Sequence, residues 1–234
     1  MIDFIPKYFS IKSNKYYSKN NLKQMRLGLG DLAPNFSATS TQGIIDFYDW
    51  LGDSWGILFS HPEDYTPVCT TELGMVANLE NQFQKRNVKT LALSVDNLAS
   101  HNTWVKEIEE VMKVKVNFPI IADDKKEIAE LYGMIHYNSN KNFTIRSVFI
   151  IGSDKKIRLT LTYPAAVGRN FDEILRVVDA LQLNENHQVL TPANWQPEGK
   201  VIIDPSIPEE ELKEKFPEGY EEVKPYLRYT PQPK

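Results

Sequence analysis

The chain has 234 residues, 41% of them hydrophobic and 11% aromatic, which suits one sizeable domain with a packed core and an appendage. Its formal net charge of −4 gives no whole-chain reason to expect a nucleic-acid partner, and no apolar run approaches the ~20 residues of a membrane span. A single cysteine excludes an intramolecular disulfide framework and favours a compartment where thiols stay reduced.

The first segment, residues 1–24, is rich in lysine and poor in acids. It contains five lysines, a single acid, Asp3, and no arginine. Transit peptides are also poor in acids, but they are typically rich in arginine. We therefore interpret this segment as a disordered leader of a cytoplasmic protein. The alternative is a transit peptide, which would place the protein in mitochondria or another organelle.

The middle of the chain alternates between strand and helix patterns. Strands are expected at 55–60, 88–95 and 118–122, and helices at 67–86, 98–111 and 125–132. Further strands at 144–151 and 156–163 flank the turn 152–155, and the last long helix is expected at 171–183. Alternating strands and helices followed by a hairpin and a helix indicate an α/β fold with a mixed central sheet flanked by helices.

The composition changes after Leu183. Eight of the 14 prolines fall from Pro192 onward, and regular periodicity fades. This predicts an irregular extension. Its apolar residues, among them Trp195 and Phe216, would be poorly buried in a free tail, so we expect docking against the main domain or a partner subunit. Disorder is the alternative, given the charge and proline content.

The lone cysteine, Cys69, lies where a strand ends and a helix begins. Pro67 suits the first helical position, so Cys69 falls in the first turn, where free backbone N–H groups and the helix dipole favour a thiolate. Thiolate is the nucleophilic form of cysteine, which predicts a reactive residue. The alternative is a small buried hydrophobic residue without chemistry.

The surrounding pattern Pro62-x-x-x-Thr66-x-x-Cys69, within FSHPEDYTPVCTTELG, closely resembles the active-site signature of the one-cysteine peroxiredoxins. The resemblance covers roughly residues 27–234, with further matches at LGDLAPNF, LGDSWGILFSHP, FPII, GRNFDEILRVVDALQL and PYLRYTPQPK. It implies a thioredoxin-like peroxidase domain at 25–183 and a C-terminal extension at 184–234 that helps to form a homodimer. It also implies no bound metal and no organic cofactor.

The same resemblance assigns catalytic roles. Cys69 matches the peroxidatic nucleophile, and Thr66 matches the hydroxyl that bonds both thiolate and peroxide. Pro62 matches the proline that shields the thiol. Arg146 matches the arginine whose fixed positive charge favours the thiolate and orients the peroxide oxygens. From the sequence alone, Arg146 is an ordinary charge at a strand end.

Three further residues are candidate supports of the site. Glu72 lies one helical turn after Cys69 and is placed to orient an arginine, and Arg169 matches another family position near the pocket. Either is otherwise a surface charge. His61, close to the motif, is a candidate for adjusting protonation in the pocket, or else a structural histidine.

The implied activity is reduction of hydrogen peroxide and organic hydroperoxides, with cysteine sulfenic acid as the intermediate. Reduction of a sulfenic acid needs a second thiol, and this chain has none. An external thiol, glutathione or a thioredoxin-type protein, is therefore the expected partner. The alternative is a peroxide sensor or chaperone, in which oxidation of Cys69 is read by a partner.

Other catalytic patterns are weaker. Residues 52–56 fit G-x-S-x-G, but Ser54 precedes a strand, whereas a nucleophile elbow lies between a strand and a helix. Some one-cysteine relatives hydrolyse phospholipids with this serine, an aspartate matching Asp154 and a histidine, where this chain has Tyr48. His101, His136 and His187 show neither a protease signature nor metal-ligand spacing.

Overall fold

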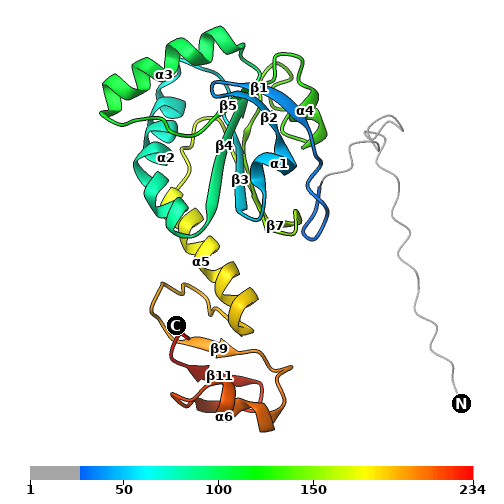
Figure 1. The fold of residues 1–234 in the computed structure, drawn as a ribbon, viewed down its shortest axis with the longest axis vertical. Helices are drawn as coiled ribbons and strands as arrows, with labels where there is room; N and C mark the ends of the chain where they lie inside the picture. Colours follow the sequence, from blue (N-terminus) through cyan, green and yellow to red (C-terminus); the bar gives the residue numbers. More distant parts are fainter. Residues whose placement is uncertain (1–26, 234) are drawn as a thin grey trace, which may run out of the picture.

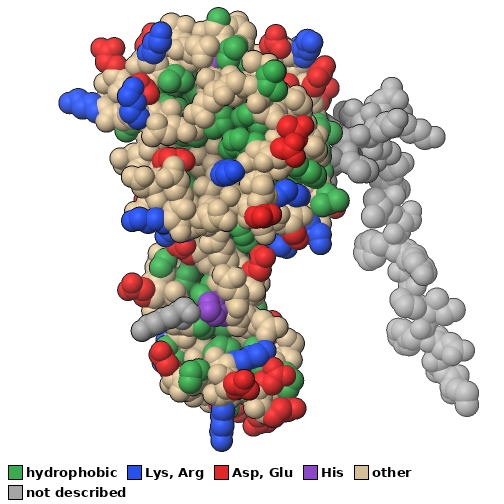
Figure 2. Space-filling model, in the orientation of Figure 1, with side chains coloured by type: hydrophobic (Ala, Val, Ile, Leu, Met, Phe, Trp, Pro, Cys, Tyr) green, Lys and Arg blue, Asp and Glu red, His purple; other side chains and the backbone are tan. Residues whose placement is uncertain are grey.

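The computed structural model describes residues 27–233, so the predicted leader at 1–24 lies outside the described residues. Figure 1 shows a large α/β body and a smaller unit below it, joined by a long helix. Figure 2 shows the same two parts in space-filling form, with acidic side chains gathered on the smaller one. In the described part of the chain, no helix combines the length and apolarity needed to cross a membrane.

A seven-stranded sheet with the order β2-β1-β5-β4-β3-β6-β7 forms the centre of the body. The strands are β1 (Ser37–Ser40), β2 (Gly43–Asp46), β3 (Trp55–Ser60), β4 (Val88–Ser94), β5 (Ile120–Ala122), β6 (Arg146–Ile151) and β7 (Ile157–Tyr163). β3, β4 and β5 run parallel, whereas β6 is antiparallel to both β3 and β7. The predicted mixed sheet is confirmed.

Helices cover both faces of this sheet. They are α1 (Phe47–Leu51), α2 (Pro67–Lys85), α3 (Leu98–Met112), α4 (Glu127–Leu131) and α5 (Phe171–His187). Apolar residues of α2, α3 and α5 pack with one face in a single cluster, and those of α1 and α4 pack with the other face in a second cluster. Burial of both faces explains why every residue of β3 and β6 is buried and why apolar residues follow one another in both strands instead of alternating with polar ones.

Most predicted elements of the body are confirmed to within a few residues. β3 has the expected bounds, and α2 begins at Pro67 with Thr66 as its N-cap. α3 begins after Asn97, whose side chain accepts a hydrogen bond from the Ser100 N–H at 3.0 Å. The hairpin β1–β2 and the helix α1 were not predicted, because four- and five-residue elements are too short to show a period.

The expectation of an irregular C-terminal extension is wrong in one respect. The extension contains a four-stranded sheet, β10-β11-β9-β8. Its elements are β8 (Val189–Leu190), β9 (Val201–Ile203), the 3-10 helix η2 (Glu209–Glu211), α6 (Leu212–Lys215), β10 (Glu221–Lys224) and β11 (Leu227–Thr230). The strands span two to four residues with prolines between them, so no hydrophobic period was visible in the sequence.

A core of its own stabilises this unit. Trp195 and Phe216 pack with Leu183 of α5, and their exposed fractions are only 4% and 5%. The indole Nε1–H of Trp195 donates to the Gly199 carbonyl at 3.2 Å. We expected these residues to dock against the main domain or a partner subunit. They are buried instead in a core of the extension itself, to which the end of α5 contributes Leu183.

Trp195→Ala tests whether this second core is energetically separate. We expect a loss of about 3–5 kcal/mol in the stability of the C-terminal unit, because a large buried side chain is deleted. Hydrogen exchange should accelerate in β9 and β11 and stay unchanged in β3 and β4. Val223→Ala is the matched control, since Val223 is half exposed on β10. Equal acceleration throughout the chain would contradict a separate core.

Candidate active site

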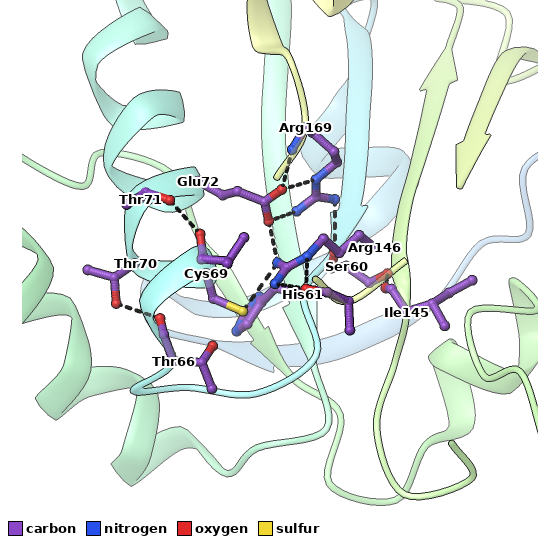
Figure 3. A network of polar contacts seen from close by, with 12 residues as sticks. Ser60, His61, Thr66, Cys69, Thr70, Thr71, Glu72, Ile145, Arg146 and Arg169 are labelled. Carbon is purple, nitrogen blue, oxygen red and sulfur yellow. Dashed lines mark hydrogen bonds and ion pairs between the residues drawn. The ribbon is translucent and has the colours of Figure 1, made fainter. Parts of the chain in front are cut away.

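The site lies where the chain leaves β3 and enters α2 (Figure 3). We call residues 61–66, which connect these two elements, the active-site loop. Cys69 is the third residue of α2. Because β6 is antiparallel to β3, with Val148 opposite Phe59, the first residue of β6, Arg146, lies beside the end of β3. Strand register therefore brings together two residues that are 77 positions apart.

Cys69 and Arg146 are in direct contact. The Arg146 Nη1–H donates to the Cys69 sulfur at 3.3 Å, and both side chains are buried. The edge of the guanidinium that carries Nε and Nη2 is held by the Ala165 carbonyl, which accepts from Nε at 3.0 Å and from Nη2 at 2.7 Å. The guanidinium is thus held rigidly against the sulfur.

Glu72 connects this arginine to a second one. Its Oε2 accepts from Arg146 Nη1 at 2.6 Å and from Arg169 Nη2 at 2.6 Å. Its Oε1 accepts from the Arg169 backbone N–H at 2.8 Å and from Arg169 Nε at 2.9 Å. The sequence suggested that Glu72 orients an arginine, and the structure places it between two. Neither Glu72 nor Arg169 is a surface charge, because both are buried.

Arg169 lies just before α5 and is satisfied on all sides. Its Nη1 donates to the carbonyls of Ser60 and Ser147, both at 2.9 Å. The guanidinium also lies 5.2 Å from the ring centre of Phe59 and 5.6 Å from that of Phe171. A buried cation with hydrogen bonds and aromatic neighbours on this scale is a fixed part of the site.

The charge balance of this cluster favours a thiolate. Two guanidinium groups and one carboxylate leave one positive charge that is buried. Burial alone would raise the pKa of Glu72, but the hydrogen bonds and charge of Arg169, together with the charge of Arg146, hold that pKa below its ordinary value. Glu72 is therefore ionised, and an anionic Cys69 sulfur would neutralise the remaining charge.

Thr66 lies one turn before Cys69 on the more open side of the site. Its hydroxyl donates to the Glu63 carbonyl at 2.9 Å and does not cap α2. Because the hydroxyl proton is used in this way, the oxygen offers its lone pairs to a substrate. Pro62 is half-buried in the same loop. Thr66 thus lies beside Cys69 (Figure 3), and Pro62 lies in the loop that leads to it.

His61 is fully buried at the start of the active-site loop. Its Nε2 lies 3.0 Å from Asp64 Oδ1, and burial lowers the pKa of the imidazole. The Asp64 carboxylate also contacts His101 of α3 at 2.8 Å. Asp64 belongs to the signature run and could have been singled out there. No local pattern in the sequence pointed to His101.

The groups of the lipid-hydrolysis pattern each bond elsewhere. Ser54 donates through Oγ to Asn87 Oδ1 at 2.8 Å, and the Tyr48 hydroxyl donates to the Ala33 carbonyl at 2.6 Å. Asp154 pairs with Arg158 at 3.1 Å. Ser54 also precedes β3 and follows α1, the reverse of a nucleophile elbow.

Comparison with known proteins gives two family matches. Residues 29–160 match the AhpC/TSA family, and residues 180–219 match the C-terminal domain of 1-Cys peroxiredoxin. The chain is 51% identical over 218 residues to 1-Cys peroxiredoxin of Dictyostelium discoideum, covering 92% of this chain and 90% of the relative. It is 53% identical over 214 residues to mitochondrial peroxiredoxin PRX1 of Saccharomyces cerevisiae, covering 88% and 82%.

Solved structures agree. The chain superimposes on yeast mitochondrial 1-Cys peroxiredoxin with a TM-score of 0.83 and 52% identity, covering 88% of this chain and 99% of that one. That protein was described with a thiol resolving mechanism via the glutathione and thioredoxin systems. The predicted thioredoxin-like fold, with a mixed sheet flanked by helices, is confirmed by this similarity.

Glu72→Gln tests the energetic weight of the buried cluster. At neutral pH we expect a loss of roughly 3–5 kcal/mol in the free energy of unfolding, because two buried arginines lose their counter-ion. Glu173→Gln is the control, since Glu173 is half exposed and its carboxylate pairs with Arg176 alone among the described residues, a contact worth under about 1 kcal/mol. Urea unfolding of both variants measures the difference.

The same variant predicts a pH dependence. The folded-state pKa of Glu72 is depressed below 4.5, so its stabilisation is present above pH 4.5 and is lost as pH falls through the lower folded value. The stability gap between the native chain and Glu72→Gln should therefore shrink on acidification below pH 4.5. A gap that is absent at neutral pH would show that the cluster contributes nothing.

Proposed function

The chain belongs to the 1-Cys peroxiredoxins, a family of thiol peroxidases, and we propose that Cys69 is the residue that reduces the peroxide. The observation that supports this assignment is the contact between the buried Cys69 sulfur and Arg146 in a cluster with one uncompensated positive charge. The substrates are hydrogen peroxide and organic hydroperoxides.

The first half of the reaction oxidises Cys69. The thiolate attacks the terminal oxygen of the peroxide, a sulfur–oxygen bond forms, and the oxygen–oxygen bond breaks. The product is a sulfenic acid, and the departing hydroxide or alkoxide takes a proton to leave as water or alcohol. Arg146 is placed to stabilise the negative charge as it moves from sulfur to the leaving oxygen. Thr66 is placed to accept the peroxide O–H and align it.

The second half of the reaction needs a reductant from outside the chain, because Cys69 is its single cysteine. An external thiol condenses with the sulfenic acid to give a mixed disulfide and water, and a second thiol releases Cys69. We assign glutathione or a thioredoxin-type protein as the donor, on the similarity to the yeast mitochondrial relative.

We also propose a homodimer. β7 is an outer strand of the main sheet. Its first residue, Ile157, bonds the backbone of Gly30 and Asp31, but no described strand pairs with the rest of its outer edge, which offers backbone groups to a second copy. The C-terminal unit exposes Tyr226 and Val223 by 69% and 50%. Sedimentation of the native chain should give a mass of two 26.9 kDa chains, and a single chain at working concentration would refute the dimer.

For location, we propose the cytoplasm, with a mitochondrial or other organellar site as the alternative because one relative is mitochondrial. The N-terminal sequence of the mature protein, read after cell fractionation, decides between them. A protein in the cytosolic fraction that retains residues 1–24 would support the cytoplasmic location. Removal of residues 1–24 in an organelle would support the alternative.

Substitutions in the site test the mechanism. Cys69→Ser should abolish peroxide consumption, and Thr66→Val should slow oxidation of Cys69 about 10²-fold because the peroxide loses its alignment. Thr66→Ser keeps the hydroxyl and should stay close to the native rate. Intact-protein mass spectrometry after mixing with one equivalent of peroxide follows the addition of one oxygen. Peroxide consumption by Cys69→Ser at the native rate would contradict the mechanism.

Turnover separates an enzyme from a peroxide sensor or chaperone. With excess peroxide and a glutathione or thioredoxin system, an enzyme consumes many equivalents of peroxide per chain. A sensor would stop after one equivalent, with Cys69 left oxidised. Multiple turnovers that vanish in Cys69→Ser are the expected result.

A further inference from the structure

A second buried polar cluster joins the active-site loop to α3 and plays no part in the chemistry described above. It consists of His61, Asp64 and His101, whose exposed fractions are 0%, 4% and 0%. One ring nitrogen of each histidine and one carboxylate oxygen of Asp64 lie within 4.8 Å of one another. Burial of polar side chains is unfavourable unless hydrogen bonds replace those lost to water, so the partners of each side chain matter.

The partners of His101 define its protonation. Its Nδ1 lies 2.8 Å from Asp64 Oδ2, and its Nε2 lies 3.1 Å from the Ile121 carbonyl oxygen. A backbone carbonyl and an ionised carboxylate only accept hydrogen bonds. Both ring nitrogens therefore carry protons, and His101 is a buried imidazolium.

Asp64 is the counter-ion. Besides His101, its carboxylate accepts from Ser100 Oγ at 2.7 Å and from His61 Nε2 at 3.0 Å. Burial alone would raise the pKa of this carboxyl, but the hydrogen bonds from His101 and His61 outweigh burial and hold the pKa well below its ordinary value. The pair is thus neutral overall and fully hydrogen-bonded, the condition under which a core tolerates two charges.

The same carboxylate sets the tautomer of His61. Because Asp64 accepts from Nε2, the proton of the neutral His61 ring lies on Nε2. His61 Nδ1 has no hydrogen-bond partner among the described residues, and burial lowers the pKa of the ring. Nδ1 is therefore a bare, buried acceptor at the start of the active-site loop.

The position of the loop depends on this cluster. Tyr65, between Asp64 and Thr66, has a left-handed backbone with φ of +55°, which is unfavourable for an aromatic residue. The Asp64 N–H is held by Asp96 Oδ2 at 3.1 Å, and the His61 ring lies 5.2 Å from that of Trp104. Because Asp64 is anchored on one side of Tyr65, the position of Thr66 on the other side is fixed as well.

The composition of the cluster would also suit a metal ion, but its geometry does not. The nitrogen–oxygen separations of 3.0 and 2.8 Å are hydrogen-bond distances, and a metal ion would need both His61 Nε2 and His101 Nδ1 to be unprotonated. The hydrogen bonds place a proton on each of these nitrogens.

We propose that His101 is a protonated positioning residue: its ion pair with Asp64 holds the active-site loop and the tautomer of His61 in the arrangement that oxidation of Cys69 requires. This role rests on the proposed peroxidase function. The protonation of His101 and the tautomer of His61 do not, so the two parts are tested separately.

Nitrogen-15 NMR of the histidine rings tests the protonation. At neutral pH, the native chain should show one ring with two protonated nitrogens, absent from His101→Gln, and one neutral ring with its proton on Nε2, from His61. His187→Gln is the matched control and should remove a different set of signals, because His187 lies at the end of α5. A bare nitrogen on His101, or a proton on Nδ1 of a neutral His61, would overturn the proposal.

Kinetics test the positioning role. Asp64→Asn and His101→Gln should each slow oxidation of Cys69 by about 10²-fold, because misplacement by about 1 Å has this effect. In Asp64→Asn, the His61 signals should show a mixture of tautomers, while His187→Gln should keep the native rate and spectrum. Folded variants that oxidise at the native rate would refute the role. If these variants fail to fold, the spectrum of the native chain still decides the protonation.

Discussion

The site depends on one carboxylate, that of Glu72, held between two buried arginines. Arg146 comes from the start of β6, Arg169 from the residue pair before α5, and Glu72 from the second turn of α2. Without Glu72, two cations would share an apolar interior without a counter-ion, at a cost of several kcal/mol. With Glu72 present, the cluster keeps one net positive charge, and Arg146 donates a hydrogen bond to the sulfur of Cys69. The same contacts fasten three elements of the fold together.

Much of this could be predicted from the sequence. The strand and helix on either side of Cys69 have strong local signals, a continuous apolar run and a proline at the first helical position. The pairing of Arg146 with Cys69 had no local signal, because it arises from the register of β6 against β3. A resemblance to known sequences supplied it. The resemblance placed Arg169 near the pocket, but the position of Glu72 between the two arginines is set by tertiary contacts that no local pattern shows.

Two parts of the chain resisted prediction for different reasons. The C-terminal sheet is built from strands too short to show alternation, and its stability comes from a few large side chains such as Trp195. His101 was not predicted as a site residue, because the sequence around it shows neither a protease signature nor metal-ligand spacing. Its partner, Asp64, lies 37 positions away and is reached only when α3 packs beside the active-site loop. Tertiary contacts of this kind leave no trace in local composition.

The helix α5 has a structural consequence. Its 17 residues form a rod about 25 Å long. The N-cap of this rod, Asn170, directly follows Arg169, and its C-terminal end lies in the core of the C-terminal unit. α5 packs in the core of the main body through Ile174 and Val178 and joins the core of the C-terminal unit through Leu183. Its start lies next to the Arg169 backbone N–H, which bonds Glu72. One continuous helix therefore connects the carboxylate cluster that faces Cys69 with the core of the C-terminal unit.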